Sequence, residues 1–144
     1  MSPRQLAGPI IALLVALGVY FAWPKEKLSP EDEIRALVAR AIVRAEQRDA
    51  SGVTEALADG FRGSGLGKQE VKQLLVGQFF RAKAIVVLNP LLEVTVKSPT
   101  EGAFKGTFLF GRDGAMPDAS KYTIEADLVK GSDGWQLVTA TWTR

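Results

Sequence analysis

The side chains of this chain that could do chemistry are carboxylates, hydroxyls and arginines, because its 144 residues include no histidine and no cysteine. Their absence excludes zinc sites built from cysteine and histidine, thiol nucleophiles, histidine-based triads and disulfide bonds. Histidine is also the side chain that most often serves as a general base. The sequence therefore predicts no metal site and no cofactor, and it favours a binding role over catalysis.

One pair of carboxylates is spaced for acid–base chemistry. Glu125 and Asp127 lie two residues apart in a predicted strand, so both project from the same face of the sheet. The apolar residues that alternate with them favour the other face as the core side. If a four-residue loop joins the last two strands, Lys130 pairs with Trp135 and both carboxylates lie on the outer sheet face. A solvated or dimer-facing role is therefore favoured over acid–base work.

Two further motifs suggest anion binding. Arg40, Arg44 and Arg48 follow one another at four-residue spacing on the polar face of a predicted helix. We interpret this arginine stripe as a solvated helix face, with an anion site as the alternative. The glycine-rich stretch 63–68 ends in lysine, but glutamine follows where a phosphate loop needs serine or threonine. We interpret that stretch as a connecting loop.

Three helices are predicted in the first half of the chain. Ser29, followed by Pro30 and three acidic residues, is typical of a helix start, and apolar residues recur at helical spacing from there onward. A short second helix is expected over 53–58. A third is expected over 68–82, after the glycine-rich loop.

Alternation of apolar and polar residues predicts strands in the second half. The expected strands cover 84–88, 92–97, 104–110, 122–130 and 135–144, with a long connection over 112–120 and a hairpin turn over 131–134. Helices followed by meandering strands indicate an α+β domain. We expect three helices packed on one face of a curved antiparallel sheet of about four strands.

Three segments together resemble the nuclear transport factor 2-like superfamily, whose cone-shaped, cystatin-like α+β fold is shared by polyketide cyclases and ketosteroid isomerases. The resemblance covers residues 30–144 and implies that fold, while its fold-level motifs say little about activity. The segments are the helix end Ala45-Glu46-Gln47-Arg48-Asp49-Ala50, the element 57–61 and the closing strand Gly134-Trp135-Gln136-Leu137-Val138.

The resemblance implies a pocket at the open end of the cone, which in enzymes of the superfamily holds a carboxylate base and polar oxyanion donors. We place no aspartate on the concave face here, and Tyr122 is the polar group that an isomerase- or cyclase-like enzyme would use. A filled core is favoured over a pocket for a small apolar ligand. The candidate pocket-lining residues are Gln78, Phe79, Phe104, Phe108, Phe110, Tyr122, Thr139 and Thr141.

Residues 6–23 are predicted to anchor the chain in a lipid bilayer. This run carries no charge, 15 of its 18 residues are apolar, and as a helix it would span about 27 Å of a hydrocarbon core that is ~30 Å thick. Cleavage as a signal peptide is the alternative, with Arg4 in its basic start. The chain is thus divided into a tail (1–5), the anchor, a linker (24–29) and a folded domain (30–144).

Charge narrows the choice of partners. Residues 28–144 carry 15 basic and 15 acidic side chains, so the net charge of +2 comes from the flanks of the anchor, and nucleic-acid binding is not predicted. We expect a single-pass protein of the cytoplasmic membrane with an exported, periplasmic domain. Its predicted role is non-catalytic binding, in a homodimer or an envelope assembly, with the isomerase- or cyclase-like enzyme as the alternative. The candidate self-association face on the outer sheet comprises Leu109, Val138 and Trp142.

Overall fold

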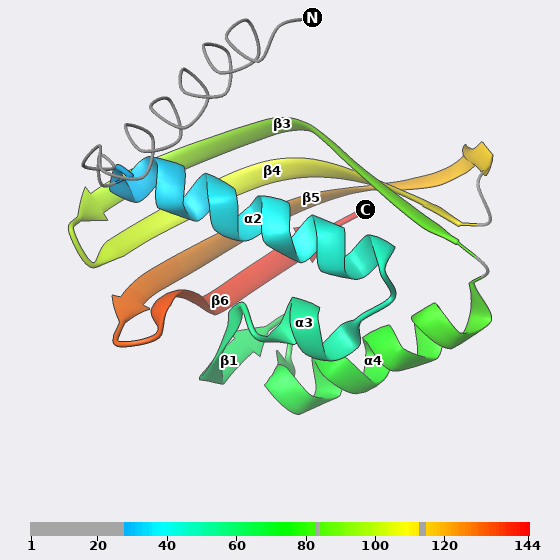
Figure 1. Ribbon diagram of the computed structural model, residues 1–144, viewed down its shortest axis with the longest axis horizontal. Helices are drawn as coiled ribbons and strands as arrows, with labels where there is room; N and C mark the ends of the chain where they lie inside the picture. The colour runs from blue at the N-terminus through cyan, green and yellow to red at the C-terminus, as the bar shows by residue number, and fades with distance from the viewer. Residues whose placement is uncertain (1–27, 83, 113–114) are drawn as a thin grey trace, which may run out of the picture.

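The computed structural model of the chain describes residues 28–82, 84–112 and 115–144 (Figure 1). The predicted tail, the anchor and most of the linker lie outside these residues. Among the described helices, none is long and apolar enough to cross a membrane. The helices are α2 (Pro30–Glu46), α3 (Ala50–Thr54) and α4 (Lys68–Arg81); the strands are β1 (Leu57–Gly63), β2 (Leu66–Gly67), β3 (Ile85–Ser98), β4 (Glu101–Arg112), β5 (Ala115–Gly131) and β6 (Gly134–Thr143).

The long helix α2 begins where the sequence predicts. The Ser29 hydroxyl accepts a hydrogen bond from the backbone N–H of Asp32 at 3.2 Å, Pro30 fills the first helical position, and three carboxylates occupy the first turn. Its apolar side, which includes Ile34 and Val38, is buried in the core. Local signals and tertiary packing therefore agree for this helix.

The sheet is mixed and has six strands, in the order β2-β1-β6-β5-β4-β3. Strands β3 to β6 form an antiparallel meander, whereas β1 runs parallel to β6, with Leu57 opposite Leu137 and Gly63 opposite Ala140. The α+β class with three helices is thus confirmed. The prediction of about four strands, all antiparallel, is wrong because it left out β1 and β2.

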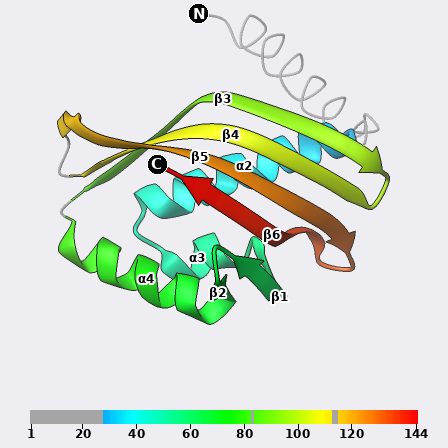
Figure 2. The same cartoon turned by 180° about the vertical axis from the view of Figure 1, so that it is seen from behind.

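The helices cover one side of the curved sheet. Figure 1 shows α2 lying across β3 to β6, with α3 and α4 grouped beside β1. Figure 2 shows the other face of the long strands, which no described helix covers. The core lies between α2 and the sheet, and its buried residues are Ile34, Leu37, Val38, Ala56, Leu57, Phe61, Val87, Phe104, Phe108, Ala126, Leu128, Trp135 and Ala140.

Strands β1 and β2 replace the end of the predicted second helix and the glycine-rich loop. The helix ends at Thr54, because the following residues pair with β6 and bury Leu57 and Phe61 in the core. Ser64 and Gly65, with φ of 47° and 84°, form the two-residue turn that joins β1 to β2. Long-range pairing, which a local pattern does not contain, decides this segment.

The strands of the meander are longer than predicted. The segments 84–88 and 92–97 belong to one strand, β3, since both pair with β4, and between them the Asn89 side-chain amide donates a hydrogen bond to the Thr107 carbonyl at 3.0 Å. This bond bridges an irregularity between Leu88 and Leu91. The predicted connection 112–120 is also wrong, since β5 begins at residue 115.

A β-bulge in the last hairpin changes which side chains face the core. Lys130 pairs with Trp135, as the four-residue turn predicts, but Leu128 pairs with Leu137 and Asp127 with Thr139. One extra residue, Val138, therefore stands in β6, and every later side chain of that strand changes face. Alternation without a bulge predicts the opposite orientation, and that prediction is wrong.

A glycine in β4 allows α2 to approach the sheet. A Cβ added to Gly102 would lie 2.8 Å from Ile34 Cδ1 and 3.2 Å from the Thr95 carbonyl oxygen. We expect Gly102→Val to lower the free energy of unfolding by about 1–3 kcal/mol through overpacking. Gly131→Val is the control, because a Cβ at Gly131 would meet nothing within 4 Å. Chemical denaturation of both variants would measure the difference, and equal stabilities would contradict the packing argument.

Candidate functional site

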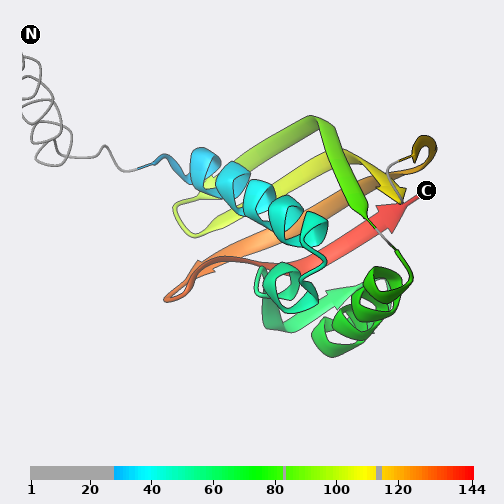
Figure 3. The same cartoon turned by 45° about the vertical axis from the view of Figure 1, so that its right-hand side comes forward.

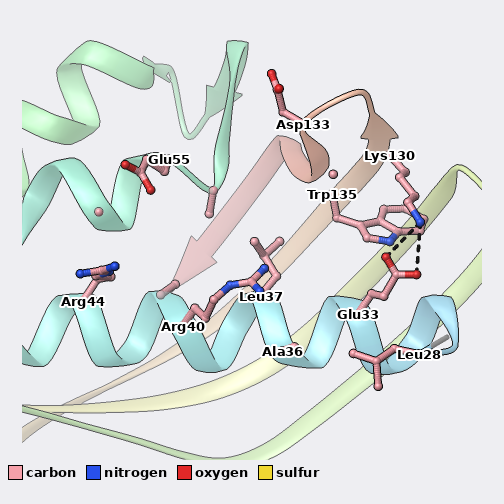
Figure 4. A pocket seen from close by; sticks show the side chains of 14 residues that line it. Leu28, Glu33, Ala36, Leu37, Arg40, Arg44, Glu55, Lys130, Asp133 and Trp135 are labelled. Carbon is pink, nitrogen blue, oxygen red and sulfur yellow. Dashed lines mark hydrogen bonds and ion pairs between the residues drawn. The ribbon is translucent and has the colours of Figure 1, made fainter. Parts of the chain in front are cut away.

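A half-open groove of about 750 Å³ lies between α2, the end of α3 and the β5–β6 turn (Figure 4). Its volume falls within the range of about 300–1,000 Å³ that is usual for ligand sites. We call it the α2 groove. Leu28, the first described residue, lies at one end of it, where the chain enters α2.

Part of the lining consists of small or apolar side chains. Ala36, Leu37 and Ala41 come from α2, while Gly52 and Ala56 come from α3 and the residues after it. Small side chains leave the backbone within reach of a bound molecule. This part of the groove therefore suits an extended ligand that lies against the helix.

Charged side chains of both signs surround these small residues. Lys130 Nζ lies 3.0 Å from Glu33 Oε2, and this ion pair joins α2 to the β5–β6 turn. Arg40 is exposed and makes no hydrogen bond or ion pair with another described residue. Figure 4 shows Arg40 on the helix side of the groove and Glu55 on the other side. Asp133, in the turn, adds a further carboxylate.

The predicted arginine stripe is divided between two environments. Arg40 and Arg44 line the α2 groove, and Arg44 Nη1 lies 3.8 Å from Asp49 Oδ2. Arg48 instead donates a hydrogen bond to the Ala82 carbonyl at 3.0 Å, which ties the end of α2 to the end of α4. Two of the three arginines are therefore available to a ligand in the groove.

Trp135 contributes an unusual polar group. The residue is 5% exposed, and its indole N–H has no hydrogen-bond partner among the described residues although it is buried. Figure 4 shows the indole beside the Glu33–Lys130 pair at one end of the groove. Buried donors without a partner are rare because each one costs free energy. The indole ring therefore closes one end of the groove, and its N–H lies below the accessible surface.

The charged side chains of the groove can bind a ligand that carries both signs of charge. An arginine offers up to five N–H donors, and a carboxylate offers acceptors, so together they bind ligands that carry both signs of charge. Among the described residues, the lining has no hydroxyl or amide side chain, and its one amine, Lys130 Nζ, is held in an ion pair with Glu33. No described group of three or more aspartates and glutamates is arranged to hold a metal ion.

Of the residues predicted to line the cone pocket, Phe104, Thr139 and Thr141 lie around one shallow depression of the sheet, and the other five lie elsewhere. Phe79, Phe104 and Phe108 are buried in or beside the core. Phe110 and Tyr122 are half-buried and meet edge to face, with ring centroids 5.7 Å apart. Gln78, Thr139 and Thr141 are exposed, and the bulge at Val138 places the two threonines on the outer sheet face.

The predicted self-association residues are also divided. Leu109 is half-buried and, by alternation from the buried Phe108, faces outward. Trp142 packs against the hydrophobic core, and a Cβ added to Gly63 would lie 2.8 Å from its ring. Val138 is the bulged residue itself. The structure therefore does not place these three side chains together on the outer face.

The outer sheet face is polar. Lys105 and Glu125 form an ion pair at 3.3 Å, while Asp127 contacts Lys97 at 3.6 Å and accepts a hydrogen bond from the Thr139 hydroxyl at 2.9 Å. Lys105, Glu125, Asp127 and Thr139 line a shallow depression of about 440 Å³. The carboxylate pair thus lies on the outer face, as predicted, and is engaged in exposed ion pairs.

Comparison with protein-family models and with curated protein sequences finds no match to this chain. Solved structures do match its architecture. An NTF2-like protein of unknown function from Pseudomonas putida KT2440 superimposes with a TM-score of 0.69, covering 78% of this chain and 84% of its own, at 17% identity. A domain of unknown function with a cystatin-like fold from Nostoc punctiforme PCC 73102 also superimposes with a TM-score of 0.69. The match covers 82% of this chain and 79% of its own, at 16% identity.

The chain has the nuclear transport factor 2-like, or cystatin-like, fold. An NTF2-like protein of unknown function from Shewanella oneidensis MR-1 agrees, with a TM-score of 0.66 over 81% of this chain and 100% of its own, at 13% identity. At these identities the likeness establishes the fold alone. The function of this NTF2-like domain must therefore be argued from its own side chains.

Most of the α2 groove escapes prediction from sequence. Glu33 and Lys130 are 97 residues apart in the chain, and Trp135 joins them only when the β5–β6 turn folds against α2. The arginine stripe is the feature of the sequence that points to the groove, because its spacing places a row of cations on one helix face. The sequence does not reveal which side of that row becomes a wall of a groove.

Proposed function

We propose that this protein is a non-catalytic binding domain, tethered to the cytoplasmic membrane by residues 6–23, that holds a segment of a partner protein in the α2 groove. The observation that carries the proposal is the groove itself: an open channel in which Arg40 and Glu55 stand on opposite sides of small residues. Neither side chain forms an ion pair with another described residue. A polypeptide supplies both signs of charge together with backbone groups, so it matches this lining better than a small apolar ligand does.

The distribution of carboxylates also supports binding over catalysis. No aspartate or glutamate with a described side chain is buried, and only Glu33 and Asp49 are half-buried. Acid–base enzymes on this kind of fold rely on carboxylates held in apolar, water-poor pockets. Here Glu33 is instead paired with Lys130. The isomerase- or cyclase-like alternative, with Tyr122 as its polar group, therefore has less support.

The proposed tether places the groove near a bilayer. Only residues 24–29 separate the predicted anchor from α2, and six residues reach at most about 20 Å. Because Leu28 lies at the entrance of the groove, a partner bound there would be close to the membrane surface. We therefore propose an envelope protein as the partner and the periplasmic side as the location.

Photo-crosslinking from the groove tests this function. We expect a photoreactive residue in place of Ala36, a small residue of the groove lining, to form an adduct of one defined mass when the full chain is irradiated in native membranes. The same residue at Lys121, exposed on β5, is the control. Adding Glu55→Arg should reduce the adduct about tenfold, because one reversed charge in an interface costs at least ~1.4 kcal/mol.

Two outcomes would contradict the proposal. One is an adduct of equal yield from positions 36 and 121; the other is no adduct from position 36. Turnover of a small ketone by the purified chain, lost in Tyr122→Phe, would favour the enzyme instead. Tyr122 lies on β5 against Phe110, away from the groove lining, so the two functions are separable.

A further inference from the structure

Strand β3 forms one edge of the sheet. It pairs with β4 on one side, and on its other side it meets no described strand. Figure 3 shows β3 as the outermost long strand, with α2 beside it. An open edge of 14 residues is a template on which a strand of another chain can pair, and natural sheets carry features that prevent this. The opposite edge, β2, has only two residues and offers little to pair with.

Two side chains of α2 bind backbone groups of this edge strand. Arg35 Nη1 donates a hydrogen bond to the Leu92 carbonyl at 3.1 Å, and the Val87 N–H donates one to Glu46 Oε2 at 3.5 Å. A backbone N–H has a single hydrogen, so the Val87 N–H is directed toward Glu46 and away from β4. We call Arg35 and Glu46 the edge pair.

The spacing of the edge pair matches the geometry of the helix and the strand. Arg35 and Glu46 are eleven residues apart, which is three helical turns, so both lie on the same face of α2. That separation is a rise of about 16.5 Å, and the step from Val87 to Leu92 along a strand also spans about 16.5 Å. Helix α2 therefore lies along β3, against which it packs, with one charged side chain at each end of this stretch.

The stretch of β3 between the two contacts is also unsuited to pairing. Pro90 has no N–H to donate, and proline within a sheet is confined to edges and irregular positions. Pairing with β4 is irregular between Leu88 and Leu91, and such an irregularity bends the strand. The edge is thus interrupted at three successive points from Val87 to Leu92.

We propose that the edge pair keeps β3 from pairing with β3 of a second copy of the chain. A strand that adds to this edge must first displace Arg35 from the Leu92 carbonyl and Glu46 from the Val87 N–H. Arg35 contributes more, because its hydrogen bond is shorter and because its guanidinium is also held by Glu31, at 3.0 Å. Neither residue of the edge pair lines the α2 groove, so this role is independent of the proposed function.

Sedimentation of the full chain in detergent micelles tests the proposal. We expect the double variant Arg35→Ala/Glu46→Ala to self-associate with a dissociation constant at least about tenfold lower than wild type, because the freed backbone groups then accept a new strand without displacing charged partners. Arg81→Ala/Glu101→Ala is the matched control, since it removes the same two charges from exposed positions on α4 and β4. Equal association of the wild type and the double variant overturns the proposal.

A conservative variant tests the donor itself. The ammonium of Arg35→Lys can still donate a hydrogen bond to the Leu92 carbonyl. We expect Arg35→Lys to associate as weakly as wild type, whereas Arg35→Ala associates more strongly. Equally strong association of the two single variants would mean that the hydrogen bond to Leu92 does not block the edge.

Hydrogen exchange separates pairing at the edge from aggregation of unfolded chains. In the associated double variant the Val87 N–H has lost Glu46, so we expect its exchange to slow as protein concentration rises. The N–H of Leu128, in the central strand β5, should stay protected throughout, because the core remains folded. Association of the double variant with a Val87 N–H that exchanges freely would place the contact elsewhere and overturn the proposal.

Discussion

Replacing Phe61 with alanine is expected to lower the free energy of unfolding by about 3–5 kcal/mol, the usual cost of deleting a buried phenyl ring. Phe61 is 2% exposed, lies in β1 and belongs to the core cluster. Its ring passes over Gly63, where an added Cβ would lie 2.6 Å from Phe61 Cζ. Because that space is closely packed, the neighbouring residues have little freedom to fill the cavity that alanine leaves.

Urea titration of the full chain in detergent, followed by circular dichroism, would measure this loss. Arg62→Ala is the matched control, since Arg62 is the next residue of the same strand and is exposed. Surface substitutions of this kind change stability by about 0.5 kcal/mol or less. Equal effects of the two substitutions would mean that β1 is not part of the core.

Strand β1 is the segment of the fold that the sequence pattern predicts least well. Residues 57–63 contain few apolar residues, two of them buried, and two glycines, so neither helical nor strand periodicity is complete. The strand forms because β6, more than 70 residues later, provides its hydrogen-bond partners. A pattern within a short window has no access to that pairing, and local propensity yields to tertiary context.

Helix α2 is the opposite case. Its cap, its proline, its acidic first turn and its apolar spacing all lie within residues 29–46, and each favours the same helix. The last hairpin, β5–β6, is predicted from the sequence only in part. Its turn and the Lys130–Trp135 pair follow from the glycines at 131 and 134, whereas the bulge at Val138 leaves no mark in the alternation.

The part of the candidate site that lies on helix α2 can be predicted from the sequence. The stripe of Arg40 and Arg44 follows from spacing alone. The opposite side of the groove comes from α3 and from a turn about 90 residues later, so its position depends on how the sheet curves under α2.

Placing an arginine in the apolar run is expected to detach the protein from the membrane. Leu14 lies at the centre of residues 6–23, and an arginine at the middle of a spanning helix costs about 3 kcal/mol, or roughly a hundredfold in membrane partition. We expect Leu14→Arg to move the chain from the pellet to the supernatant after carbonate extraction. The matched control is Leu91→Arg, at an exposed leucine of the folded domain, which should stay in the pellet.

Alkaline phosphatase fused after Arg144 extends the same experiment to the side of the membrane. Because the apolar run is also the proposed export signal, the wild-type fusion should be active and the Leu14→Arg fusion inactive. An inactive wild-type fusion would contradict export of the domain. A wild-type chain that is active but soluble, with residues near the start missing from its mass, would identify the run as a cleaved signal peptide.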